Sequence, residues 1–89
     1  MLRTVIESLE VSAKIDAESA IYPRLEEAYD ALKWWLARRA GTGEIIDDYH
    51  WLYKQAGNRY LHIPALVALY SFDGHSVEII SILIRIPTL

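Results

Sequence analysis

Two apolar segments joined by Asp73-Gly74 constrain the fold of this chain more than any other feature. An Asp-Gly pair between two such runs is typical of a β-hairpin with a two-residue type I′ turn, in which both central residues have positive φ. We therefore expect residues 60–72 to form one strand and residues 75–86 to form the returning strand.

The turn also fixes which residues face each other. If Phe72 pairs with His75, the register places His62 opposite Arg85 and gives two further pairs, Tyr70–Val77 and Leu66–Ser81. Side chains alternate along a strand, so the hairpin has two faces. The face expected to be buried is apolar: Leu61, Ile63, Ala65, Val67, Leu69, Ile80, Ile82, Ile84 and Ile86. The other face is partly polar: Tyr60, His62, Tyr70, Ser81 and Arg85.

The composition is that of one globular domain. The chain has 89 residues, of which 53% are hydrophobic and 24% charged, and this length can bury a modest core. Without cysteine it forms no disulfide and no thiolate metal site. The net charge of −3 argues against a protein that binds nucleic acid with its whole surface, and leaves a local basic patch open. We expect a cytoplasmic protein, because the start of the chain lacks a signal-peptide pattern and no apolar run approaches the roughly 20 residues of a membrane span.

Two helices are predicted in the first half of the chain. Ser8 is a candidate N-cap for a helix over residues 9–21, and the alternation of apolar residues in the same segment leaves a strand open as the alternative. Pro23 suits the first turn of a second helix. The apolar stripe of that helix is followed by the glycines expected to end it: Leu25, Tyr29, Leu32, Leu36, Gly41 and Gly43.

The remaining segments complete a sheet. We expect Leu2–Ile6 to form a short strand and Tyr49–Lys54 to form an aromatic-rich one, followed by a turn at residues 55–58 whose loop length stays ambiguous. The predicted order is strand, helix, helix and then three strands as a meander. The sequence therefore predicts an α+β domain, with two N-terminal helices packed on one face of an antiparallel sheet.

Four segments, taken in order, carry a family resemblance: residues 4–11 (TVIESLEV), 36–43 (LARRAGTG), 66–74 (LVALYSFDG) and 77–85 (VEIISILIR). They look like an opening strand that runs into a first helix, the end of a second helix, and a last hairpin. On these segments, which span nearly the whole chain, the protein resembles the RelE/ParE superfamily of bacterial toxins. The resemblance implies the toxin of a type II toxin–antitoxin system, held inactive by a cognate antitoxin that wraps it.

The resemblance implies one of two targets. RelE-like members are ribosome-dependent mRNA endonucleases, whereas ParE-like members inhibit DNA gyrase and are not nucleases. Lys54 and Arg85 match basic positions of the RelE-type site. Active members usually carry an Arg just ahead of the apolar run that leads to Tyr70, and here residues 63–67 (IPALV) occupy that stretch. The resemblance therefore points to an atypical or non-nucleolytic member, with a non-toxic protein-interaction module of the same fold as the alternative.

The expected site is the partly polar face of the hairpin. His62 and Arg85 could contact one phosphate, His62 as an acid or base and Arg85 as a stabiliser of phosphoryl charge, with Lys54 as a third catalytic candidate. The alternative is that these are ordinary surface side chains. Candidates for binding the target or a nucleic acid are Arg59, Tyr70 and Ser81.

Three tryptophans are candidates for contact with a partner. Trp34 and Trp35 occupy successive helix positions, so both cannot face one core, and Trp51 could stack on a partner or pack in the core. No cofactor is expected, and the acidic residues near His50 form no metal-binding spacing. Besides an antitoxin, a second copy of the chain stays open as a partner.

Overall fold

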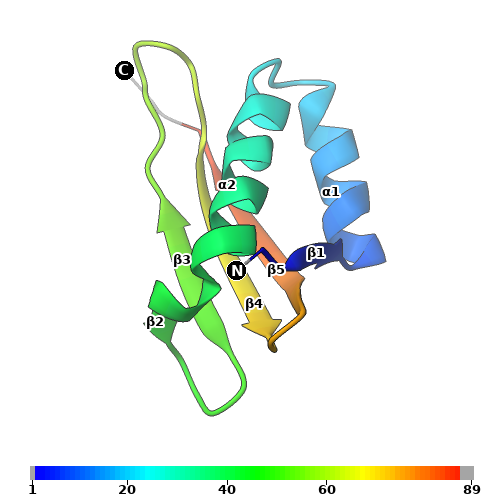
Figure 1. Ribbon diagram of the computed structural model, residues 1–89. Coiled ribbons are helices and arrows are strands. Elements are labelled where there is room, and N and C mark those ends of the chain that lie inside the picture. Colours follow the sequence, from blue (N-terminus) through cyan, green and yellow to red (C-terminus); the bar gives the residue numbers. More distant parts are fainter. Residues whose placement is uncertain (1, 87–89) are drawn as a thin grey trace.

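The computed structural model describes residues 2–86 and confirms an α+β fold, in which two helices cover one face of a sheet (Figure 1). The elements are β1 (Thr4–Glu7), α1 (Leu9–Ser19), α2 (Leu25–Arg39), the 3-10 helix η1 (Ala40–Thr42), β2 (Glu44–Ile45), β3 (Trp51–Gln55), β4 (Ala65–Phe72) and β5 (Ser76–Arg85). The strand order is β1-β5-β4-β3-β2. Because β1 runs parallel to β5, the sheet is mixed, and the expectation of an antiparallel sheet is corrected for that strand.

Local signals explain both helices. The Ser8 hydroxyl accepts a hydrogen bond from the Val11 N–H at 3.1 Å, as an N-cap does, so α1 is a helix and the strand alternative is wrong. In α2, acidic residues lie in the first turn and Arg38 and Arg39 in the last, which complements the helix dipole. The two helices lie side by side over the sheet (Figure 1).

The core fills the space between the helices and the sheet. Its members come from both helices, η1, β4 and β5: Val11, Ile15, Leu25, Ala28, Tyr29, Leu32, Leu36, Ala40, Leu66, Ala68, Tyr70, Val77, Ile79 and Ile82. Burial of each large apolar side chain contributes roughly 1.5–3 kcal/mol. This cluster therefore fixes which face of β4 and β5 the helices cover.

The turn between β4 and β5 is longer than predicted. Phe72 pairs with Val77, not with His75, and the Asp73 N–H donates to the Ser76 carbonyl at 3.0 Å. The Asp73 carboxylate accepts hydrogen bonds from the N–H groups of His75 and Ser76, at 2.7 and 2.8 Å. No glycine in residues 2–86 has positive φ, so the type I′ turn that requires it is not formed.

The predicted faces of the hairpin are wrong for β4. Leu66, Ala68 and Tyr70 point to the helices, whereas Val67 and Leu69 lie on the opposite face. Both sets are apolar, so alternation alone did not distinguish them. On β5 the predicted burial of Ile82 is confirmed. The register shifts by one residue at a β-bulge, which turns Ile82 toward the helices.

The β-bulge lies at Ile80. Leu69 pairs with Ser81 and Tyr70 with Ile79, which leaves Ile80 as the extra residue. Val77 and Ile79 therefore face the helices before the bulge, and Ile82 faces them after it.

Residues 60–63 form a loop and not the start of a strand. Asn58 closes this loop by a bridge to Ile63, and its side-chain oxygen accepts hydrogen bonds from the N–H groups of Tyr60 and Leu61. His62 has a φ of 56°, which lies in the left-handed region and is incompatible with a strand. The two-residue strand β2 was not predicted.

Candidate binding face of the sheet

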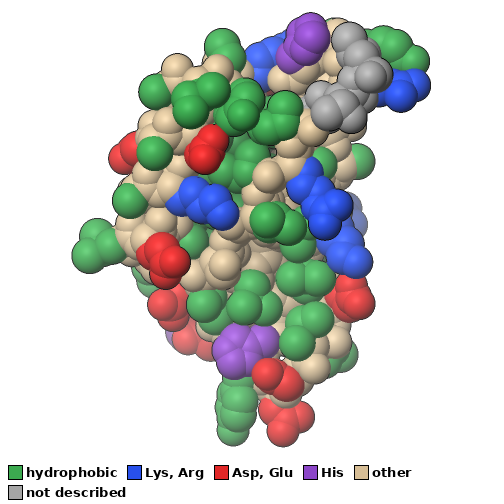
Figure 2. Space-filling model, turned by 180° about the vertical axis from the view of Figure 1, so that it is seen from behind, with side chains coloured by type: hydrophobic (Ala, Val, Ile, Leu, Met, Phe, Trp, Pro, Cys, Tyr) green, Lys and Arg blue, Asp and Glu red, His purple; other side chains and the backbone are tan. Residues whose placement is uncertain are grey.

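The face of the sheet that α1 and α2 leave uncovered is here called the open face. The strand registers place on it the side chains of Glu44, Leu52, Lys54, Ala65, Val67, Leu69, Ser71, Glu78, Ser81, Leu83 and Arg85. Figure 2 shows the molecule from this side, with hydrophobic side chains scattered among charged ones. Leu83 is 47% exposed, which is a large exposed fraction for a leucine in the middle of a strand. The middle of the open face is therefore an apolar strip, made of Leu52, Val67, Leu69 and Leu83, with charged side chains around it.

Lys54 and Arg85 border one hollow of this face. The hollow has a volume of about 440 Å³ and lies at the end of the sheet where β3 and β5 finish, with Ala65 and Val67 at its floor. Lys54 reaches Glu44 on the neighbouring strand at 3.8 Å, and both side chains are mostly exposed. Such an exposed ion pair contributes little to stability, so Lys54 stays accessible to a ligand.

The hollow can hold an anion by charge, because two cations border it. Among the described residues that line it, none is a histidine, aspartate or glutamate. Lys54 is therefore the lining residue that could act as a general acid or base there.

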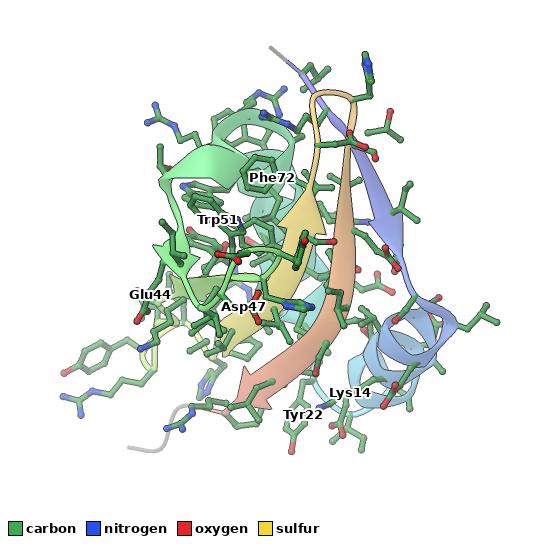
Figure 3. The ribbon with its side chains drawn as sticks, turned by 90° about the horizontal axis from the view of Figure 1, so that it is seen from below. Lys14, Tyr22, Glu44, Asp47, Trp51 and Phe72 are labelled. Atoms are coloured by element: carbon green, nitrogen blue, oxygen red, sulfur yellow. The ribbon has the colours of Figure 1, made fainter. Side chains whose placement is uncertain are left out.

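A second hollow, of about 340 Å³, lies at the opposite end of the sheet. Its walls are aromatic and acidic: Asp48, Tyr49, Trp51, Ser71, Phe72, Asp73, Ser76 and Glu78. The rings of Trp51 and Phe72 meet edge to face with centroids 5.1 Å apart, and Figure 3 shows the two side chains next to each other.

Side-chain hydrogen bonds within two short loops, one before β3 and one between β4 and β5, surround the acidic hollow. The Asp47 carboxylate accepts hydrogen bonds from the N–H groups of Tyr49 and His50 and contacts the His50 imidazole at 2.8 Å. The Tyr49 N–H and the imidazole lower the pKa of the Asp47 carboxyl below its usual value. The N–H groups of His75 and Ser76 likewise lower the pKa of Asp73. Both carboxyls therefore stay ionised at neutral pH.

The predicted pair of His62 and Arg85 is not formed. Arg85 pairs with Ala65 across the hairpin, and His62 lies in the preceding loop beside a separate hollow of about 230 Å³ with Tyr22 and Pro64. The prediction failed because it assumed a tighter turn and a longer strand. The structure instead brings Arg85 together with Lys54.

Tyr70 cannot take the predicted role in target binding. Its side chain is fully buried, and its hydroxyl donates a hydrogen bond to the Ala40 carbonyl at 2.6 Å. Burial raises the pKa of Tyr70 to about 12. A Cβ atom on Gly43 would overlap the Tyr70 hydroxyl, so the glycine at this position makes room for it.

The other two residues predicted to bind the target are exposed. Ser81 lies on the open face opposite Leu69. Arg59 lies in the loop before β4, where its guanidinium stacks over the Tyr60 ring at 5.0 Å. Arg59 does not line the hollow that Lys54 and Arg85 share.

The three tryptophans have different environments. Trp34 is 55% exposed on α2, with the Arg38 guanidinium 4.3 Å from the centre of its ring. Trp35 stacks on Tyr53 of β3, with ring centroids 3.7 Å apart. Trp35 and Trp51 therefore pack partly into the core, and only Trp34 presents most of its surface to a possible partner.

Sequence reasoning missed the acidic hollow. Its residues come from two loops and from strand ends that are far apart in the chain, so no local motif announces them. Within residues 2–86 no group of three His, Asp or Glu side chains is placed to hold a metal ion.

Comparisons with known proteins gave no match, whether with family models, curated proteins or solved structures. Across the part of the chain that the structure describes, neither helix combines the length and the apolar character that crossing a membrane requires. The function therefore has to be argued from the open face itself.

Proposed function

We propose that this chain is a growth inhibitor of the RelE/ParE kind, which acts in the cytoplasm by binding a target protein and is neutralised by a cognate antitoxin. The observation that carries the proposal is the open face, where the exposed Leu83 lies in an apolar strip next to Lys54 and Arg85. Exposed apolar surface with a charged border is typical of protein-binding sites. The order of strand, two helices and meander, from which the resemblance was argued, supports the same class.

Two features favour binding over RNA cleavage. The described lining of the hollow at Lys54 and Arg85 contains no histidine or carboxylate, and His62 lies outside it. DNA gyrase, the target of ParE-like members, is therefore the first target to test.

Cleavage of ribosome-bound mRNA is the second candidate function. It is favoured by the shared hollow, since two cations beside an open apolar floor could hold an RNA phosphate. A non-toxic protein-interaction module is the remaining candidate function.

The test is inducible expression of the chain in bacteria, with growth, gyrase supercoiling and messenger integrity as readouts. We expect growth arrest with inhibited supercoiling and intact messengers. Arrest with cleaved messengers would replace the first proposal by the second, and unimpaired growth would leave only the interaction module.

The Arg85→Ala variant tests the site. We expect it to abolish growth arrest without lowering the melting temperature, because Arg85 is exposed and its loss removes a binding contact only. Arg39→Ala, which removes an exposed arginine at the end of α2, is the matched control and should arrest growth like the wild type. Arrest by Arg85→Ala as strong as that of the wild type would contradict the assignment of this site.

A further inference from the structure

The open face is electrically polarised along the strands. Its basic end carries Arg85, with Lys54 nearer the middle, and its acidic end carries Asp48, Asp73 and Glu78. In Figure 2, acidic side chains gather toward the lower end of the molecule, whereas lysine and arginine side chains lie in its middle and upper parts. A face with opposite charges at its two ends complements a second copy of itself that is turned end to end.

The strand register makes this complementarity specific. Arg85 pairs with Ala65 on β4, and Glu78 pairs with Ser71. Ala65 and Ser71 each lie three residues from Ala68, on opposite sides of it. Consider two copies whose open faces meet, related by a two-fold axis that lies midway between the two sheets. If this axis runs at right angles to the strands and passes over Ala68, it places Arg85 of one copy over Glu78 of the other.

The same axis matches the rest of the face. Val67 of one copy meets Leu69 of the other, since both lie one residue from Ala68. Lys54, opposite Val67, then lies over Leu52 of the second copy, whose neighbour on β2 is Glu44. Apolar side chains thus meet at the centre and unlike charges meet at both ends.

We infer that two copies of this chain associate face to face through their open faces, with antiparallel strands. Facing sheets lie about 10 Å apart, a gap that an arginine and a glutamate can bridge from opposite sides. The alternative two-fold axis, parallel to the strands, would bring the two acidic ends together and is disfavoured by repulsion. The dimer covers the surface proposed for target binding, so target and second copy compete for it.

The dimer is expected to be weak. Eight residues of β4 at about 3.3 Å each and three strands about 4.8 Å apart give a contact of roughly 400 Å². This is about half of the ~800 Å² that each partner buries in a standard stable interface. Association should therefore be seen only at high protein concentration, and it should weaken with salt because of its charged ends.

Sedimentation velocity of the purified chain at low ionic strength is the test. As the loading concentration rises, the weight-average mass should climb from 10.2 kDa toward twice that value. Arg85→Glu and Glu78→Arg should each raise the dissociation constant by at least about tenfold, because each creates two like-charge contacts per dimer. Arg39→Glu, on α2 and away from the open face, is the matched control and should associate like the wild type.

Mixing the variants makes the test decisive. In a mixture of Arg85→Glu with Glu78→Arg, both contacts pair unlike charges again, so a heterodimer should form from two chains that are monomeric alone. In a mixture of Arg39→Glu with Glu78→Arg, one of the two contacts pairs like charges, so this heterodimer should be weaker than the complementary one. Circular dichroism checks that each variant is folded. A wild type that stays monomeric at every concentration, or a complementary mixture without heterodimer, would overturn the inference. Both outcomes are independent of growth arrest, which tests the proposed function.

Discussion

The Tyr70 hydroxyl ties the middle of the sheet to the end of α2. Its side chain is fully buried and its hydrogen bond to the Ala40 carbonyl joins residues 30 positions apart. A buried carbonyl that loses its donor has no water to replace it. This contact gives the buried Tyr70 hydroxyl a partner on the helix side of the sheet.

Tyr70→Phe should lower the free energy of unfolding by about 1–2 kcal/mol, because it leaves the buried Ala40 carbonyl without this donor. Urea denaturation measures the change. Tyr53→Phe is the control: the Tyr53 hydroxyl has no hydrogen bond to any residue in 2–86, so its loss should change stability by less than about 0.5 kcal/mol. Equal effects of the two substitutions would contradict the role given to the Tyr70 hydroxyl.

Alkaline pH tests the same residue. Burial raises the pKa of Tyr70 to about 12 from an ordinary value of 10.0, so between these values the hydroxyl ionises in the unfolded chain while it stays neutral in the folded one. The stability that Tyr70 contributes is present below pH 10 and is lost as the pH rises toward 12. The advantage of the wild type over Tyr70→Phe in urea denaturation should therefore shrink across this range. An advantage that stays constant to pH 12 would show that the pKa is not raised.

At the scale of elements, β5 combines two environments in ten residues. Its first part, Ser76–Ile79, lies between β4 and β1, and the rest forms an edge of the sheet on the side that β1 leaves uncovered. Lys14 of α1 partly closes this edge, because its ammonium donates a hydrogen bond to the Ile82 carbonyl at 2.8 Å. The bulge at Ile80 then sets which of the later side chains face the core.

Substitutions at two neighbouring positions of β5 test which of its side chains face the core. Ile82→Asp places a charge in the core beside α1 and should cost more than about 4 kcal/mol, enough to unfold a domain of ordinary stability. Leu83→Asp changes an apolar residue on the open face and should leave a folded protein with a cooperative thermal transition. A folded Ile82→Asp variant, or an unfolded Leu83→Asp variant, in circular dichroism melts would contradict the assignment of faces.

The sequence predicted the two helices, the β3–β4–β5 meander and the two layers, because Ser8, the stripe of α2 and the apolar runs are local signals. It predicted neither β2 nor the parallel pairing of β1 with β5. It did not predict the register, because this depends on the Asp73 side chain, which builds a four-residue turn, and on the bulge at Ile80. Both faces of β4 are apolar, so the pattern of apolar residues does not distinguish them, whereas the packing of the core and the hydrogen bond of the Tyr70 hydroxyl do. Of the three catalytic candidates, Lys54 and Arg85 line one hollow, whereas His62 lies elsewhere, and a catalytic role for any of them stays a prediction.

At the scale of the whole molecule, the two faces of the sheet differ: the helices cover one and leave the open face uncovered (Figures 1 and 2). The helices provide the buried layer that holds the sheet together. In our proposals, the open face binds either a target or a second copy of the chain, and the two compete for it. Self-association would therefore reduce the amount of chain that is free to act at high concentration.

Growth arrest by Leu83→Asp, measured against Leu9→Asp, tests the central claim that the open face is the active surface. Both substitutions replace an exposed leucine by a charge: Leu83 is 47% exposed on the open face and Leu9 is 91% exposed on α1. We predict that Leu9→Asp arrests growth like the wild type, whereas Leu83→Asp accumulates to the same level, stays folded and no longer arrests growth. Undiminished arrest by Leu83→Asp would contradict the account.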